Sequence, residues 1–88
     1  MKLKEGFVLR KMPGMNIVMP VGTTAKDFRK TVVLNDTAAF IFELFQSGET
    51  VDTVPSKLTE IYDIDLETAE RAVKTTVENL IEAGIADV

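Results

Sequence analysis

In the middle of the chain, an extended segment passes directly into a helix, with no residues left over for a loop. The segment from Lys30 to Leu34 is rich in β-branched residues, which favour strands. Asn35 follows as a natural helix N-cap, because its side-chain oxygen can accept a hydrogen bond from an N–H of the first turn. Asp36 adds a carboxylate at the positive end of the helix dipole. The pattern predicts a strand over about Phe28 to Leu34 and a helix that Gly48 ends.

Two more β-prone runs precede this junction. Phe7 to Met12 and Met15 to Val21 flank Pro13-Gly14, a turn dipeptide, so a hairpin is predicted. The residues from Gly22 to Lys26 read as a polar connection. Three strands in sequence with short links predict an antiparallel meander.

After Asn35 the apolar residues recur every three or four positions, as on one face of a helix. The expected buried face of the first helix is Ala38, Ile41, Leu44 and Phe45, and Phe40 and Phe42 are expected to widen it toward the sheet. A second helix repeats the spacing with Val51, Val54, Leu58 and Ile61. Pro55 should kink this helix if Thr50 is the cap, but costs little if Asp52 or Thr53 is the cap. We expect a distorted or late start.

The third helix is predicted to be the longest. Asp65 can cap it, with Glu67 in the first turn, and Gly84 supplies the left-handed residue that commonly ends helices. Its expected buried stripe is Leu66, Ala69, Val73, Val77 and Leu80. Ile85 should then fold back as an apolar anchor, with Val88 a second candidate. A sheet followed by three helices is the α+β class.

Length and composition indicate one small domain over residues 1–88, with 45% hydrophobic residues and no cysteine for a disulfide. No segment is long and apolar enough to serve as a signal peptide or membrane span, so we expect a soluble, cytoplasmic protein. The net charge of −4 is uneven. Residues 1–30 carry seven Lys or Arg and two carboxylates, whereas residues 31–88 carry three Lys or Arg and twelve carboxylates. This is either ordinary solvated surface or a positive surface for an acidic partner.

The usual elements of catalysis are missing from the sequence. Without histidine or cysteine, neither a serine–histidine nor a cysteine–histidine nucleophile pair can form, and the common zinc ligands are absent. The glycines form no phosphate-binding motif. Asp63 to Glu67 resembles the start of a calcium loop, but Thr68 and Lys74 stand where glycine and glutamate are needed. We therefore predict a protein that is not an enzyme and has no cofactor and no metal.

A sheet followed by three helices is also typical of winged-helix proteins, which insert a recognition helix into DNA. The predicted third helix carries only Arg71 and Lys74 against four glutamates, and phosphates would repel such a helix. A winged-helix DNA-binding regulator is the alternative function, and we predict no nucleic-acid partner.

The order and spacing of several segments resemble the PqqD family, whose members are peptide-recognition elements. The segments are Leu34 to Ala38, an aromatic-rich helix through Phe45, Gly48 to Val51, Tyr62 to Asp65 and Leu80 to Ile85. Pro55 departs from the family pattern, which puts the geometry of the second helix in doubt.

The resemblance implies a winged-helix-like fold of three strands against three helices. It also implies that the leader region of a ribosomally made precursor peptide adds as a strand beside the third strand, next to the third helix. The implied peptide-binding residues are Lys30, Thr31, Val32, Val33, Leu34, Arg71, Lys74, Thr75 and Glu78. The alternative for the four helix residues is plain solvent exposure.

The resemblance implies two partners. One is the leader region of the precursor peptide. The other is a peptide-modifying enzyme, often of the radical S-adenosylmethionine type, and the iron–sulfur cluster would belong to that enzyme. Involvement of pyrroloquinoline quinone itself stays open. An exposed strand edge also makes a homodimer possible.

Overall fold

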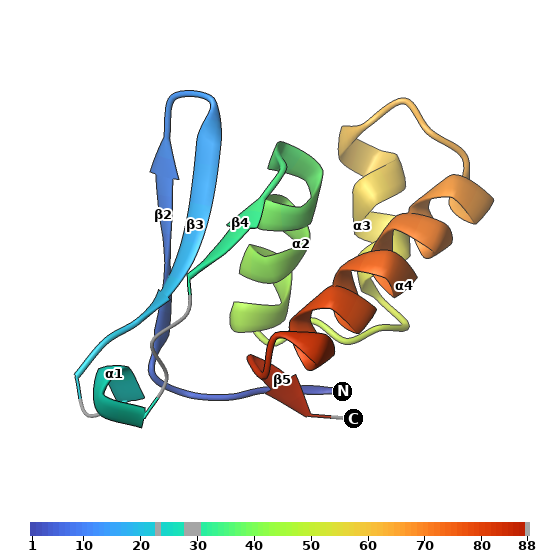
Figure 1. Cartoon of the computed structure of the whole chain (residues 1–88). Helices are drawn as coiled ribbons and strands as arrows, with labels where there is room; N and C mark the ends of the chain where they lie inside the picture. The colour runs from blue at the N-terminus through green and yellow to red at the C-terminus, as the bar shows by residue number, and fades with distance from the viewer. Residues whose placement is uncertain (23, 28–30, 88) are drawn as a thin grey trace.

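The computed structural model of the chain describes residues 1–22, 24–27 and 31–87. The elements, in order, are β1 (Lys2–Leu3), β2 (Phe7–Met12), β3 (Met15–Pro20), α1 (Thr24–Asp27), β4 (Val32–Leu34), α2 (Asp36–Gln46), α3 (Val54–Ile61), α4 (Leu66–Glu82) and β5 (Ala86–Asp87). Figure 1 shows the sheet of β2, β3 and β4 on one side of the molecule and α3 and α4 on the other, with α2 between them. The α+β class is confirmed.

The main sheet is the predicted antiparallel meander, in the order β2-β3-β4. Gly14 has a φ of 74° in the hairpin turn, a conformation that favours glycine. β4 begins at Val32, so Thr31 lies outside it, and the expected strand residues 28–30 fall outside the described residues. The connection after β3 contains the short helix α1, which the sequence reading missed.

α2 begins where the cap predicted. Asn35 Oδ1 accepts a hydrogen bond from the backbone N–H of Ala38 at 2.8 Å. Phe42 is buried in the core cluster that includes the sheet residues Phe7 and Val18, as expected. The prediction for Phe40 was wrong: its ring packs edge-on against Tyr62, with centroids 6.0 Å apart, on the side of α3 and α4. Two residues along a helix turn the side chain by about 200°, so Phe40 and Phe42 cannot face the same partner.

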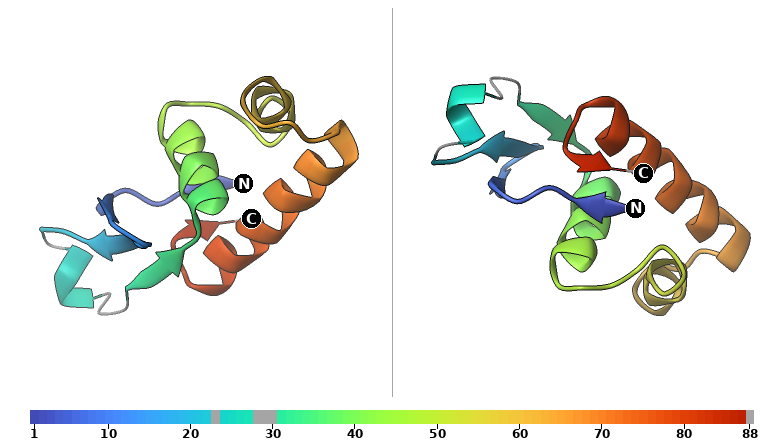
Figure 2. Two further views of the ribbon diagram at one scale, coloured as in Figure 1. Left: turned by 90° about the horizontal axis from the view of Figure 1, so that it is seen from above. Right: turned by 90° about the horizontal axis from the view of Figure 1, so that it is seen from below.

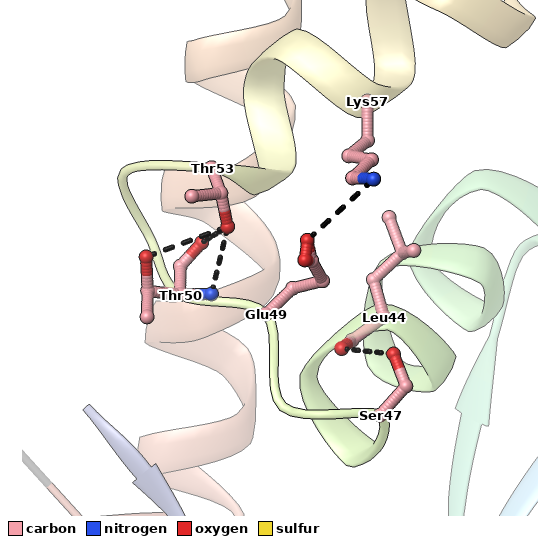
Figure 3. A network of polar contacts seen from close by, with 6 residues as sticks. All are labelled: Leu44, Ser47, Glu49, Thr50, Thr53 and Lys57. Carbon is pink, nitrogen blue, oxygen red and sulfur yellow. Dashed lines mark hydrogen bonds and ion pairs between the residues drawn. The ribbon is translucent and has the colours of Figure 1, made fainter.

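The link between α2 and α3 explains the late start of the second predicted helix (Figure 3). The backbone N–H of Thr50 donates to Thr53 Oγ1 at 2.9 Å, and the backbone N–H of Thr53 donates to the Thr50 carbonyl at 3.1 Å. This closed turn delays the helix to Val54, so Pro55 lies in the first turn. The expected apolar stripe was wrong at both ends, because Val51 precedes the helix and Ile61 is 60% exposed.

α4 is capped by Asp65, whose Oδ1 accepts from the backbone N–H of Thr68 at 2.7 Å. Ala69, Val73 and Leu80 are buried as predicted, but Leu66 is 51% exposed. The first turn of α4 lies at the edge of the molecule (Figure 1), and Leu66 in that turn is only half covered. Gly84, with a φ of 82°, ends the helix, and Ile85 is fully buried as the expected anchor. Val88 lies outside the described residues.

A second, two-stranded sheet joins the ends of the chain and was not predicted. β1 pairs antiparallel with β5, so that Lys2 lies opposite Asp87, and the backbone N–H of Lys4 donates to the Ile85 carbonyl at 2.8 Å. Met1 and Leu3 pack against both hydrophobic clusters, one between the sheet and α2 and the other among the helices. The N-terminal segment therefore packs between the two hydrophobic clusters and contacts both.

Candidate functional site

β4 is one of the two edge strands of the main sheet, and β2 is the other. β4 pairs with β3 on one side, with Val33 opposite Ile17, and no described strand pairs with its other side. Val33 is 63% exposed, whereas Leu34 is buried beneath it in the core. Thr31, just before the strand, is also exposed, and Lys30 falls outside the described residues. The predicted edge from Thr31 to Leu34 is thus open to an added strand over the described residues.

The direction of the backbone groups at this edge follows from Asn16, which is buried on β3 opposite Leu34. Asn16 Nδ2 donates to the Leu34 carbonyl at 3.1 Å, so the backbone groups of Leu34 face β3. In an antiparallel strand, successive residues direct their N–H and C=O to opposite sides. The N–H and C=O of Val33 therefore face the free edge, where a bound peptide could use both.

Asn16 also fixes the junction that the sequence singled out. The same Nδ2 donates to Asp36 Oδ1 at 2.8 Å, which ties the first residue of α2 to the central strand. Sequence reasoning missed this residue. Its signal was a polar amide near the start of an apolar strand, which is costly to bury unless it is hydrogen-bonded.

A hollow of about 460 Å³ begins where β4 ends. We call it the polar hollow, because six of its eleven lining residues are threonine or asparagine. The lining residues are Asn35, Thr37, Ala38, Tyr62, Ile64, Thr68, Arg71, Ala72, Thr75, Thr76 and Asn79. They come from the start of α2, the link before α4 and one flank of α4 itself. Tyr62, Ile64 and the two alanines add apolar surface, so the hollow suits a side chain with an apolar body and a polar end.

Arg71 is the cation of the polar hollow. Its Nη2 lies 3.5 Å from Glu67 Oε1, but both side chains are largely exposed, and such a pair contributes little to stability. The guanidinium is therefore available to an acidic group of a ligand. Nearby, hydrogen bonds from Thr68 hold the pKa of Asp65 below its ordinary value, with the charge of Arg71 a smaller cause. Asp65 thus stays ionised as the cap of α4.

The predicted helix residues do not all lie on one side of α4. Arg71 and Thr75 line the polar hollow. Lys74 and Glu78 line a second groove of about 530 Å³ on the other flank of α4, together with Val51 from the link before α3 and Pro55 from its first turn. The structure therefore brings Arg71 and Thr75 to the junction that follows β4, and it separates Lys74 and Glu78 from it. Their part in peptide binding stays a prediction.

Several lining residues were missed or understood differently from the sequence. Ala72 and Thr76 line the polar hollow, and they were not predicted to do so. Tyr62 and Ile64 were assigned only to the link before the last helix. A polar stripe at Thr68, Thr75 and Asn79 follows the helical period and could have indicated a ligand-facing flank.

Within the part of the chain that the structure describes, no cluster of carboxylates could hold a metal ion. No helix formed by the described residues is long and apolar enough to cross a lipid bilayer.

Comparison with known families assigns the chain. Residues 17–86 match the family model described as coenzyme PQQ synthesis protein D (PqqD). The chain belongs to the PqqD family. The match begins within β3 and includes all of β4 and α4, and therefore both sides of the candidate site. A search of curated proteins finds no significant match.

A solved structure shares the PqqD fold seen here. It is described as TbiB1 in complex with the TbiA(beta) leader peptide, and it superposes with a TM-score of 0.78. The alignment covers 99% of this chain and 95% of that chain, at 16% sequence identity. A likeness at this identity concerns the fold.

Proposed function

We propose that this PqqD family member is a non-catalytic adaptor that binds the leader region of a ribosomally made precursor peptide. The leader adds as a strand along β4, and the adaptor presents it to a peptide-modifying enzyme. The observation that carries the proposal is the free edge of β4, which runs directly into the polar hollow beside α4. Family membership and the leader peptide bound by TbiB1 support it.

Strand addition suits this edge for a physical reason. The N–H and C=O of Val33 face outward, and main-chain hydrogen bonds contribute roughly 0.5–1.5 kcal/mol each. These bonds are independent of peptide sequence, so selectivity has to come from side-chain pockets. A peptide that continues past Leu34 reaches the polar hollow, where Arg71 can pair with an acidic side chain and Thr75 can hydrogen-bond a polar one.

A proline substitution tests strand addition. Val33→Pro removes the outward N–H and should weaken leader-peptide binding at least about tenfold, the equivalent of roughly 1.4 kcal/mol. Val33→Thr is the matched control, since it keeps the N–H and the β-branched shape. Binding is measured by fluorescence anisotropy with a labelled leader peptide, and folding by circular dichroism. Amide shift changes that cluster on α3 and spare residues 31–34 would place the peptide elsewhere.

Charge reversals on α4 decide between the two grooves. Arg71→Glu should weaken binding of an acidic leader, and more strongly at low salt, because the charge is exposed. Lys74→Glu changes the net charge equally but lies on the other flank. If Lys74→Glu has the larger effect, the peptide uses the groove beside α3.

The same proposal covers the partner enzyme and the cellular place. We propose a cytoplasmic adaptor for a radical S-adenosylmethionine or other peptide-modifying enzyme, which would carry any iron–sulfur cluster itself. A homodimer through the β4 edge would compete with the peptide for the same backbone groups. DNA binding gains no support, because the exposed positions of α4 include Glu67, Glu70, Glu78 and Glu82.

A further inference from the structure

The main sheet is apolar on both faces. Side chains alternate along each strand, and Phe7, Val18 and Leu34 point toward α2 and the core. The alternate residues along each strand point to the opposite side of the sheet and form what we call the outer face. The outer face consists of Val8, Arg10, Met12, Met15, Ile17, Met19 and Val33. An antiparallel sheet with one solvated face normally carries polar residues there, but here Arg10 is the one polar member.

The outer face does not contribute to the core of the described part of the chain. None of its six apolar residues belongs to, or packs against, either hydrophobic cluster. Met12, Met15 and Val33 are 46%, 38% and 63% exposed. The other three apolar residues are half-buried: Val8, Ile17 and Met19. Figure 2 shows α2 against the opposite face, and Figure 1 shows α1 beyond the ends of the strands away from the hairpin turn. An apolar face that is left partly open in this way marks an interaction surface.

Arg10 indicates what kind of partner fits. It lies on the middle of β2, opposite Ile17, with Val8 and Met12 on either side of it along the strand. No described carboxylate forms an ion pair with it. The outer face itself holds no carboxylate, so a second copy stacked face to face would leave Arg10 without an opposite charge from that face, which is unfavourable when water is excluded. The complementary surface is therefore apolar with a carboxylate opposite Arg10.

The outer face is also continuous with the proposed peptide site. A strand added beside β4 directs alternate side chains to the same side as Val33, so the bound peptide extends the outer face by one strand. Three residues of the outer face are methionines, whose flexible side chains adapt to a partner surface.

We propose that the outer face is the docking surface for the peptide-modifying enzyme, which contacts the adaptor and the bound peptide together. This inference rests on the proposed function, because the shared contact needs a peptide strand along β4. An enzyme surface that contacts both the outer face and the bound peptide should bind the peptide-loaded adaptor more tightly than the adaptor without peptide. The enzyme would thereby select adaptors that carry a substrate.

The test uses the modifying enzyme and the precursor leader peptide encoded beside this gene, both purified. Arg10→Glu should weaken enzyme binding about tenfold or more, as expected for reversal of a charge in an interface. The double change Met12→Ser and Met15→Ser should also weaken it. Lys2→Glu on β1 is the matched control, with the same change in net charge on an exposed residue outside the outer face. Enzyme binding is measured by surface plasmon resonance with and without the leader, and leader binding by anisotropy.

The expected result is loss of enzyme binding in both outer-face variants while leader affinity stays at the wild-type level. Unchanged enzyme binding in both variants, or no enzyme binding by the wild-type adaptor, would overturn the inference. A wild-type dimer in sedimentation that Arg10→Glu abolishes would assign the face to a second copy and also overturn it. Failure of the leader to bind wild-type adaptor would refute the proposed function separately, since it is measured without the enzyme.

Discussion

Replacing Asn16 by alanine tests whether one buried amide holds the strand–helix junction together. Asn16 is 5% exposed, and its Nδ2 donates to the Leu34 carbonyl at 3.1 Å and to Asp36 Oδ1 at 2.8 Å. A neutral hydrogen bond contributes roughly 0.5–1.5 kcal/mol and one to a charged group about 1.5–3 kcal/mol. We therefore expect Asn16→Ala to lower the free energy of unfolding by about 2–4 kcal/mol.

A loss of this size is a large part of the 5–15 kcal/mol typical of small domains. For a chain of this length, roughly 3 kcal/mol corresponds to a Tm lower by about 12–24 °C. Urea unfolding followed by circular dichroism gives the free energy, and differential scanning calorimetry gives the Tm. Leader binding should weaken as well, because the junction positions both β4 and the polar hollow.

A double-mutant cycle isolates the charged hydrogen bond. Asn16→Ala, Asp36→Ala and the double variant should show a coupling free energy of about 1.5–3 kcal/mol. Asp36→Asn is the conservative control, since it keeps an oxygen acceptor for the amide. A loss below about 0.5 kcal/mol for Asn16→Ala, or a coupling near zero, would refute the reasoning, because water would then replace the amide at no cost.

Three further predictions concern the fold and the excluded function. Leu58→Ala should destabilise the protein by about 2–5 kcal/mol in urea unfolding, whereas Ile61→Ala, 60% exposed on the same helix, should have little effect. The pKa of Asp65 is lowered in the folded protein, so its carboxylate adds to the free energy of unfolding above pH 3.8, the ordinary pKa value. This addition is lost as the pH falls through the folded pKa, so in urea unfolding at a series of pH values Asp65→Asn should show a weaker loss of stability over that range. Titration with random DNA duplex at low salt should show no sub-micromolar binding; tight binding that weakens steeply with salt would contradict this.

The sequence predicted the features that depend on neighbouring residues. Asn35 and Asp65 cap their helices through contacts three residues away, and Gly84 ends α4 through its own backbone conformation. Such local interactions leave a local pattern. The late start at Pro55 was predictable for the same reason.

Features that depend on distant contacts were missed. The pairing of β1 with β5 joins residues more than eighty positions apart in two-residue strands, which are too short to show a period. Leu66 and Ile61 fit the apolar period of their helices, yet the ends of those helices extend past their packing partners, so both are exposed.

The candidate site was predicted in part. That β4 is an edge strand could be inferred because it is last in the meander and so has one neighbour, as β2 has at the other edge. The rotation of α4 about its axis, which its packing against α2 and α3 sets, decides which residues face which groove. It places Arg71 and Thr75 on one flank and Lys74 and Glu78 on the other. A list of exposed helix residues carries no information about that rotation.

The pairing of β1 with β5 makes this protein a good subject for circular permutation. The two ends of the chain leave the molecule side by side (Figure 1), with Lys2 opposite Asp87. A short flexible linker could join them, and the exposed Pro13-Gly14 turn could be opened to create new termini without breaking any strand. Because both ends leave at the same place, a second domain fused to either one would have much the same reach to the free edge of β4.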